Sequence, residues 1–147
     1  MKILITGGAG FIGVRLANAL LDKGVLSGIS GEEEPIDELL LFDTVDAGGL
    51  FEKKQKGVLI RHSAGDISDK ETVKSLINRD DISVFHLASV VSGGGEKDFD
   101  LAMRVNLDGG RYLLEALRQK GGLQRVVFAR LLVKLTVGER PSPLVAS

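Results

Sequence analysis

The chain has 147 residues, of which 44% are hydrophobic and 27% charged, and its formal net charge at pH 7 is −1. These values fit one domain of ordinary size and exclude both a disordered chain and a strongly basic nucleic-acid-binding surface. The absence of cysteine excludes disulfides, zinc–thiolate sites and cysteine nucleophiles. No stretch reaches the ~18 apolar residues that a membrane span needs. We therefore expect a cytoplasmic protein with no membrane and no nucleic-acid partner.

The first strand is expected over residues 2–6, and it runs directly into a glycine-rich turn. A helix follows from about residue 10 to residue 23, because apolar residues recur at helical spacing up to Gly24. A strand, a glycine-rich turn and a helix in this order are typical of a dinucleotide phosphate cradle. The alternative is a tight strand-to-helix turn without a ligand.

Three glycines of this turn have separate expected roles in such a cradle. Gly7 permits the tight turn, Gly10 lets the backbone approach a pyrophosphate, and Gly13 lets the helix pack on the strand. Gly8 is an additional glycine outside these three positions. The free N–H groups of the first helical turn, at Phe11 and Ile12, and the positive end of the helix dipole would then hold the phosphates.

The second strand is expected over residues 39–42, after an exposed loop over residues 28–38 that is rich in glycine and acidic residues. Its continuous apolar run is typical of a strand covered on both faces. Asp43 closes the strand, where a carboxylate can bind the adenosine ribose hydroxyls and repel a 2′-phosphate. This position favours NAD over NADP as the cofactor. The alternative is an aspartate that only begins a turn.

The remaining elements continue the same alternation of strands and helices. The third strand is expected at 57–62, a helix at 70–78 capped by Ser68 or Asp69, the fourth strand at 83–87, a loop at 88–96, a long helix at about 99–120 and the fifth strand at 125–128. Strands that alternate with helices predict an α/β fold with a parallel sheet.

Four ordered motifs carry a family resemblance. They are residues 6–13, residues 65–67, residues 86–88 and residues 105–109. Together they resemble the extended short-chain dehydrogenase/reductase superfamily, in its NAD-dependent epimerase/dehydratase group, and residues 86–93, 98–101 and 104–109 are similar to its D-erythronate dehydrogenase branch. The resemblance implies a Rossmann-like doubly wound parallel sheet of strand order 3-2-1-4-5, which binds NAD where strands one and four meet.

The resemblance also implies roles for further residues. Asp66 would receive the exocyclic amine of the adenine and Ile67 would pack on its ring. Ala88, Ser89 and Val90 would form the edge along which the cofactor passes, and Leu87 would also belong to the cofactor site. Asn106 would hydrogen-bond backbone near the active site in a supporting role, whereas His86 would pack rather than act as a base. No metal ligand is expected.

The catalytic residues of the resembled family are not found in this sequence. The family places serines directly after the fifth strand and then a tyrosine with a lysine four positions later. Here Ala129 is followed by Arg130 and Leu131, and the single tyrosine, Tyr112, has Ala116 four positions later. We therefore expect Tyr112 to pack and the chain to lack a catalytic pair.

The resemblance ends at about residue 129, and residues 130–147 are unrelated to the family pattern. We expect a partial NAD-binding domain over 1–129 and a divergent tail over 130–147, as in a C-terminally truncated product of a longer dehydrogenase. Three interpretations stay open. The chain is the NAD-binding part of an oxidoreductase that acts on a small sugar acid, a nucleotide-binding module without turnover, or a fragment of a sugar-nucleotide epimerase or dehydratase. Homodimerisation through helix 99–120 is a further expectation.

Overall fold

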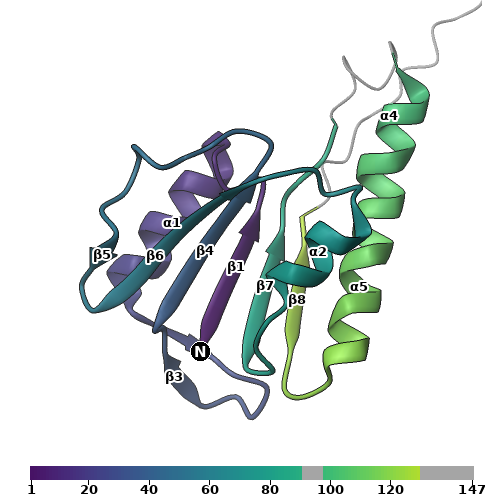
Figure 1. Cartoon of the computed structure of the whole chain (residues 1–147). Helices are drawn as coiled ribbons and strands as arrows, with labels where there is room; N and C mark the ends of the chain where they lie inside the picture. The colour runs from purple at the N-terminus through teal and green to yellow at the C-terminus, as the bar shows by residue number, and fades with distance from the viewer. Residues whose placement is uncertain (91–97, 130–147) are drawn as a thin grey trace, which may run out of the picture.

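A twisted, mainly parallel sheet forms the centre of the chain in the computed structural model, which describes residues 1–90 and 98–129 (Figure 1). Helix α1 covers one face of the sheet, and α2 and α5 cover the other (Figure 1). The strands are β1 (Lys2–Thr6), β4 (Glu38–Asp43), β5 (Lys54–Gln55), β6 (Val58–Ala64), β7 (Ile82–His86) and β8 (Arg125–Phe128). The helices are α1 (Phe11–Lys23), α2 (Lys70–Leu76), α4 (Phe99–Met103), η1 (Arg104–Asp108) and α5 (Gly109–Lys120).

The strand order is β5-β6-β4-β1-β7-β8. The five predicted strands therefore lie in the predicted order 3-2-1-4-5, and all four contacts between them are parallel. The short β5 adds an antiparallel edge beside β6, which no sequence pattern indicated. The α/β prediction is confirmed, and the order reverses at β1, which lies between β4 and β7.

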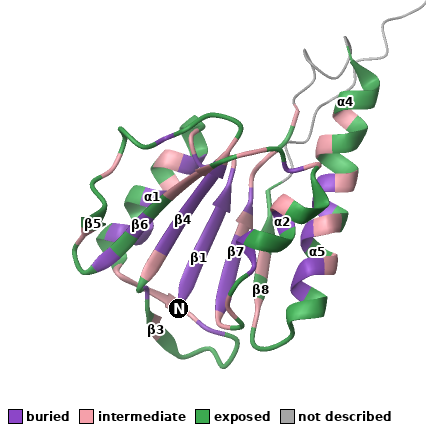
Figure 2. Cartoon of the chain, viewed as in Figure 1, coloured by how far each residue is buried: buried purple, intermediate pink, exposed green. Residues whose placement is uncertain are grey.

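The hydrophobic core has two halves, one on each side of the sheet. Leu4 of β1 belongs to the half under α2 and α5, whereas Ile3 and Ile5 belong to the half under α1. Figure 2 shows that burial is concentrated in the central strands β1, β4 and β7. Because β1 and β4 are covered on both faces, their sequences are continuous apolar runs, as predicted.

Helix ends follow local chemistry. Gly24 adopts a left-handed conformation with φ of 72° and its N–H bonds to the carbonyl of Leu20, which ends α1 where predicted. Asp69, rather than Ser68, caps α2, because its side chain accepts the N–H of Glu71 at 3.1 Å.

The exposed loop predicted over residues 28–38 is wrong in part. Residues Val25–Ser27 (β2) and Glu33–Pro35 (β3) pair as a small antiparallel hairpin, and Ile36 is buried in the core. Arg125 of β8 donates to the carbonyl oxygens of Ser27 and Gly28. This long-range contact fixes the hairpin against the sheet, and no local pattern predicts it.

The long helix predicted over 99–120 exists but is not uniform. Its middle, η1, is a π turn between α4 and α5. Asp98 caps the first turn by accepting the N–H of Leu101 at 2.9 Å, and Gly121 ends the last. π turns occur frequently at functional sites, and this one contains Asn106.

Two expectations fall outside the described residues: most of the 88–96 loop and the divergent tail from 130. Within residues 1–90 and 98–129, no helix is long and apolar enough to cross a membrane. The same residues contain no group of three or more histidine, aspartate or glutamate side chains that could hold a metal ion.

Candidate functional site

Two glycines of the turn between β1 and α1 lie where a side chain would clash with backbone or be strained. Gly7 has φ of 71°, and a Cβ there would lie 3.0 Å from the backbone nitrogen of Ala88. A Cβ on Gly13 would collide with the carbonyl oxygen of Gly7 and lie 2.8 Å from the Cα of Gly8. The turn role of Gly7 and the packing role of Gly13 agree with this geometry.

Gly8, which lies outside the three expected positions, is also sterically required. It is buried, and a Cβ there would lie 2.9 Å from the Cβ of Leu41 and 3.0 Å from the carbonyl oxygen of Ile5. Its N–H donates to the carbonyl of Phe42 at 3.0 Å, which ties the turn to β4. The turn therefore packs on β4 as closely as on β1.

The start of α1 presents free backbone donors. Gly10 is the N-cap residue, provides no side-chain cap, and no acidic residue occupies the first turn. The first two helical residues, Phe11 and Ile12, are 77% and 59% exposed, and the first N–H groups of a helix have no intrahelical partner. An uncapped helix start with accessible N–H groups and a positive dipole end is suited to an anion such as a phosphate.

Asp43 lies at the end of β4, beside the glycine turn. Its Oδ2 accepts the N–H of Ala9 at 2.9 Å and its Oδ1 accepts the N–H of Thr44 at 2.7 Å. These two bonds hold the carboxylate at the mouth of the turn, where it is only partly buried. Its remaining lone pairs are available to hydroxyl donors.

Asp66 and Ile67 follow β6 in the loop that leads to α2. Oδ1 of Asp66 accepts both the N–H and the hydroxyl of Ser68, at 2.8 and 2.7 Å, which leaves Oδ2 without a partner among the described residues. Ile67 is 4% exposed, because it packs into the core against Gly109 of α5. Only a small part of this side chain is available to a ligand.

The end of β7 is held by a buried hydroxyl. Thr6 Oγ1 accepts the N–H of Ala88 at 3.2 Å and lies 2.8 Å from Nδ1 of His86. The hydroxyl has one proton and two lone pairs, so the direction of its bond to Nδ1 depends on the imidazole tautomer. His86 is 5% exposed and packs edge-on against Phe128, which agrees with the predicted packing role.

The buried imidazole predicts a pH dependence of stability. Burial lowers the pKa of His86, so the unfolded chain binds the proton more readily than the folded chain. The free energy of unfolding should therefore fall as the pH drops below about 6.5, the ordinary histidine pKa. Urea unfolding across this range should show this fall in the wild type and a weaker one in His86→Gln. Equal slopes in the two proteins would contradict the assignment.

Asn106 of the π turn holds the segment after β7. Its Oδ1 accepts the N–H of Val90 at 2.8 Å and its Nδ2 donates to the carbonyl of Val90 at 3.0 Å. The hydrogen bonds to backbone that the resemblance implied are therefore present. Tyr112, one turn beyond η1, packs against the core as predicted.

A cleft of about 390 Å³ joins these elements at the carboxyl ends of the parallel strands. Eight of the twelve predicted cofactor residues line it: Gly7, Gly10, Asp43, Asp66, Ile67, Leu87, Ala88 and Ser89. Phe11, Ile12, Gly13 and Asn106 do not. Val90, which was expected on the edge along which the cofactor passes, lines the cleft too. Further lining residues were not predicted as cofactor residues; they include Thr44, Gly65, Leu101 and Val105.

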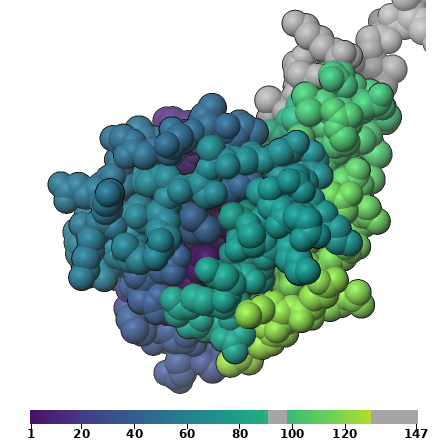
Figure 3. All heavy atoms as spheres, in the orientation of Figure 1, coloured from purple at the N-terminus to yellow at the C-terminus, as the bar shows by residue number. Residues whose placement is uncertain are grey.

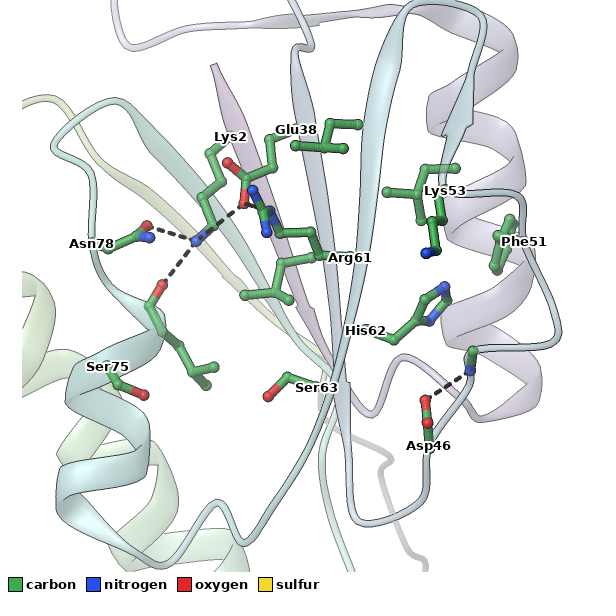
Figure 4. Close-up of a pocket in the computed structure, with 15 residues that line it drawn as sticks. Lys2, Glu38, Asp46, Phe51, Lys53, Arg61, His62, Ser63, Ser75 and Asn78 are labelled. Carbon is green, nitrogen blue, oxygen red and sulfur yellow. Dashed lines mark hydrogen bonds and ion pairs between the residues drawn. The ribbon is translucent and has the colours of Figure 1, made fainter.

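A larger hollow of about 800 Å³ lies elsewhere, along β6. The face shown in Figure 3 is hollowed between β6 and α2. In Figure 4, Lys2, Glu38 and Arg61 lie on one side of β6, and His62 stacks on Phe51 on the other. This hollow contains none of the predicted cofactor residues, and it includes Lys2 and Glu38 at the amino ends of β1 and β4. The smaller cleft is therefore the better candidate, since ligands of open parallel sheets bind at the carboxyl ends beside the reversal of strand order.

The fold and the cleft define a Rossmann-like α/β protein. The sequence profile of the 3-beta hydroxysteroid dehydrogenase/isomerase family matches residues 4–131, and the chain belongs to this family.

Two similar proteins are D-erythronate dehydrogenases. The one from Cupriavidus necator is 47% identical over 128 residues, which are 87% of this chain and 38% of that protein. The one from Haemophilus influenzae is 31% identical over 147 residues, 100% of this chain and 42% of that protein. The chain thus spans about two fifths of the length of these curated relatives.

Among solved structures, the UDP-glucose 4-epimerase of Thermus thermophilus in complex with NAD matches with a TM-score of 0.65 and 33% identity. The match covers 97% of this chain and 43% of that one. These similarities confirm the predicted superfamily.

Proposed function

We propose that this chain binds NAD in the cleft at the carboxyl ends of β4, β1 and β7. The observation that carries the proposal is that the glycine turn, the Asp43 carboxylate and the end of β7 line the same cleft. A similar solved structure is described as a complex with NAD. Titration calorimetry of the chain with NAD tests the proposal, and a folded sample that binds no NAD would overturn it.

Each part of the cleft suits one part of this cofactor. The donors at the start of α1, at Phe11 and Ile12, would hold the pyrophosphate, and the carboxylate of Asp43 would accept hydrogen bonds from the ribose. Asp66 and Ile67 would lie by the adenine. Ala88 and Ser89 would border the path to the nicotinamide, where small side chains leave room. Bound NAD would supply the hydride acceptor.

The charge of Asp43 predicts cofactor selectivity. Asp43→Asn keeps the size of the side chain but removes the charge that binds ribose hydroxyls and repels a 2′-phosphate. We expect about tenfold weaker NAD binding and a smaller preference for NAD over NADP. Calorimetry with both cofactors measures the change. Asp46→Asn is the matched control, since exposed Asp46 caps Gly48 nearby and does not line the cleft. The same loss in both variants would contradict the role of Asp43.

We further propose that the chain is the NAD-binding part of a cytoplasmic oxidoreductase resembling D-erythronate dehydrogenase, which oxidises a secondary hydroxyl of a small sugar acid. The support is the 47% identity to such an enzyme over 87% of this chain. NADH absorbance in a mixture of the chain, NAD and D-erythronate tests for turnover.

The second candidate is a nucleotide-binding module without turnover. It is favoured by the sequence, which contains no tyrosine with a lysine four positions later, and by the packing of its single tyrosine, Tyr112, against the core. Calorimetric NAD binding without NADH formation would support this candidate.

A third candidate, a part of a sugar-nucleotide epimerase or dehydratase, is supported by relatives such as CDP-paratose 2-epimerase, 30% identical over 134 residues. Binding of a nucleotide sugar by the chain would favour it.

A homodimer through the α4–α5 helix completes the proposal. Four apolar residues of this helix are each at least 40% exposed, and their spacing of four or seven residues places them on one side of it. They are Phe99, Met103, Leu107 and Leu114. An apolar stripe of this kind is suited to a second copy. Light scattering of the wild type and of Leu114→Glu measures the mass.

A further inference from the structure

The outer side of β6 is the part of the sheet to which the proposed function gives no role. β5 pairs only with Val58 and Leu59, at the start of this strand. One further bond follows, from the N–H of Ile60 to the carbonyl of Lys53 at 2.8 Å. Residues 61–64 continue along β4 without a second partner strand in the described part of the chain. The outer backbone side of these four residues is called the open edge below.

The open edge presents backbone donors and acceptors. Leu59 and Gly65 donate their N–H groups toward β4, whereas Ile60 donates away from it. His62 and Ala64 follow Ile60 in this alternation, so their N–H and C=O groups also face away from β4. These four groups have no hydrogen-bond partner within residues 1–90 and 98–129. A row of unpaired groups on an edge strand is a template for another strand.

Space for the side chains of an added strand lies on both faces of the sheet at this edge. The hollow of about 800 Å³ along β6 is lined by Arg61 and Ser63 on one face and by His62 and Phe51 on the other. In Figure 4 the first pair lies on the side of α2, and the second lies on the side of the loop before β5. Because the side chains of a strand alternate between faces, the hollow suits an extended segment.

The contacts of His62 are incomplete without an occupant. Its ring stacks on Phe51 with centroids 6.2 Å apart, but both ring nitrogens are buried and lack a hydrogen-bond partner among the described residues. A buried polar group without a partner costs about 1–3 kcal/mol. An acceptor on the side chain of an occupant would give one of these nitrogens a partner.

Charge favours an acidic occupant. Residues 52–61, which form β5 and the first half of β6, contain four cations and one acid. Lys53 is one of these cations, and its exposed side chain lines the hollow. The two acids that line the hollow are already engaged, because Asp46 accepts the N–H of Gly48 and Glu38 faces three cations. The open edge therefore lies in net positive surroundings.

We infer that the open edge of β6 binds an extended acidic peptide of a partner protein, which adds to the sheet as a further strand. The main chain of the peptide pairs with His62 and Ala64, and its acidic side chains lie near Lys53 and Arg61. In strand addition, main-chain hydrogen bonds provide affinity and side-chain contacts provide specificity. The hollow and the proposed NAD cleft have no lining residue in common, so neither site requires the other.

The test is fluorescence anisotropy of the full chain with a labelled seven-residue peptide of alternating glutamate and valine. The first control peptide has the same sequence with methylated backbone nitrogens, so it keeps its charge but cannot donate to the edge. The second control peptide alternates lysine and valine. We expect the acidic peptide to bind and both control peptides to bind about tenfold more weakly or not at all.

Variants of the chain locate the binding site. Lys53→Glu should weaken binding of the acidic peptide about fivefold, because a repulsive charge replaces an attractive one. Lys120→Glu is the matched control, since this exposed lysine of α5 does not line the hollow, and it should leave the affinity unchanged. Ala64→Pro removes one outward N–H, which an edge strand tolerates, and should weaken binding about tenfold. Circular dichroism checks that each variant is folded.

Each contrary result overturns the proposal in a different way. A folded wild type that binds no acidic peptide at about 1 mM would show that the edge is not a binding site. Equal affinity for the methylated peptide would exclude strand addition, and equal affinity for the lysine peptide would exclude an acidic partner. Unchanged affinity in both Lys53→Glu and Ala64→Pro would place the peptide elsewhere. A mass that doubles with concentration in light scattering, but not in Ala64→Pro, would assign the edge to a second copy of this chain.

Discussion

Gly13→Ala is expected to abolish measurable NAD binding and to lower the free energy of unfolding by about 3 kcal/mol. The added methyl group would collide with the carbonyl oxygen of Gly7 and lie 2.8 and 3.0 Å from the Cα and carbonyl carbon of Gly8. All of these are backbone atoms, so no side-chain rotation can make room. Helix α1 would have to move away from the turn, and the donors at its start would move with it. Calorimetry and urea unfolding measure the two effects.

Two other glycines separate the effect on binding from a general effect on stability. Nothing lies within 4 Å of a Cβ built on Gly49, so Gly49→Ala should change neither quantity. Gly24 also has free space but a φ of 72°, so Gly24→Ala should cost about 1 kcal/mol and leave NAD affinity intact. Wild-type NAD affinity in Gly13→Ala would show that the close packing of α1 on the turn is not needed for binding.

The sheet could be predicted from the sequence because its strands are local features. The runs Ile3–Ile5 and Leu39–Phe42 are apolar on both faces and bounded by polar or glycine residues, which is enough to place parallel strands. The hairpin of β2 and β3 could not be predicted in this way. Arg125 holds it against the sheet and reaches the carbonyl oxygens of Ser27 and Gly28 from nearly 100 residues away in the sequence.

The cleft, too, combines features that are local in the sequence with contacts between residues far apart in it. Asp43 and Asp66 each follow a predicted strand, so their approach to one edge of the sheet could be predicted from the order of elements. Leu101 and Val105 look like ordinary helix residues, and the packing of Gly109 on Ile67 and the bonds of Asn106 to Val90 bring their helix to the cleft. The requirement for Gly8 was missed because its neighbour, Leu41, belongs to the next strand.

At the opposite ends of the strands, a buried lysine is the centre of an ionic cluster. Lys2 is 1% exposed, and its Nζ donates to the carbonyl of Leu76 at 3.1 Å and to Oδ1 of Asn78 at 2.7 Å. Glu38 lies 3.7 Å from this amine, 3.5 Å from Nε of Arg61 and 3.9 Å from Arg79 (Figure 4 shows the first two pairs). One carboxylate therefore faces three cations.

Glu38→Gln is expected to lower the free energy of unfolding by about 3 kcal/mol at neutral pH, as measured by urea unfolding. The substitution keeps the size of the side chain, so the cost comes from leaving Lys2 charged and buried beside two arginines. Arg61→Gln is the matched control. The Arg61 side chain is 61% exposed and its loss removes only a solvated partner, so we expect a cost below about 1 kcal/mol.

The pH dependence distinguishes this electrostatic cost from a loss of packing. Burial lowers the pKa of Lys2, and Glu38 opposes that shift, so the Lys2 pKa should fall further in Glu38→Gln. A lysine with a depressed pKa in the folded state destabilises the fold while it is charged, and this penalty decreases as the pH rises toward its unfolded pKa. The stability deficit of Glu38→Gln should therefore shrink as alkaline pH removes the proton from Lys2. A deficit that stays constant up to about pH 10 would instead mean that Glu38 acts through packing alone.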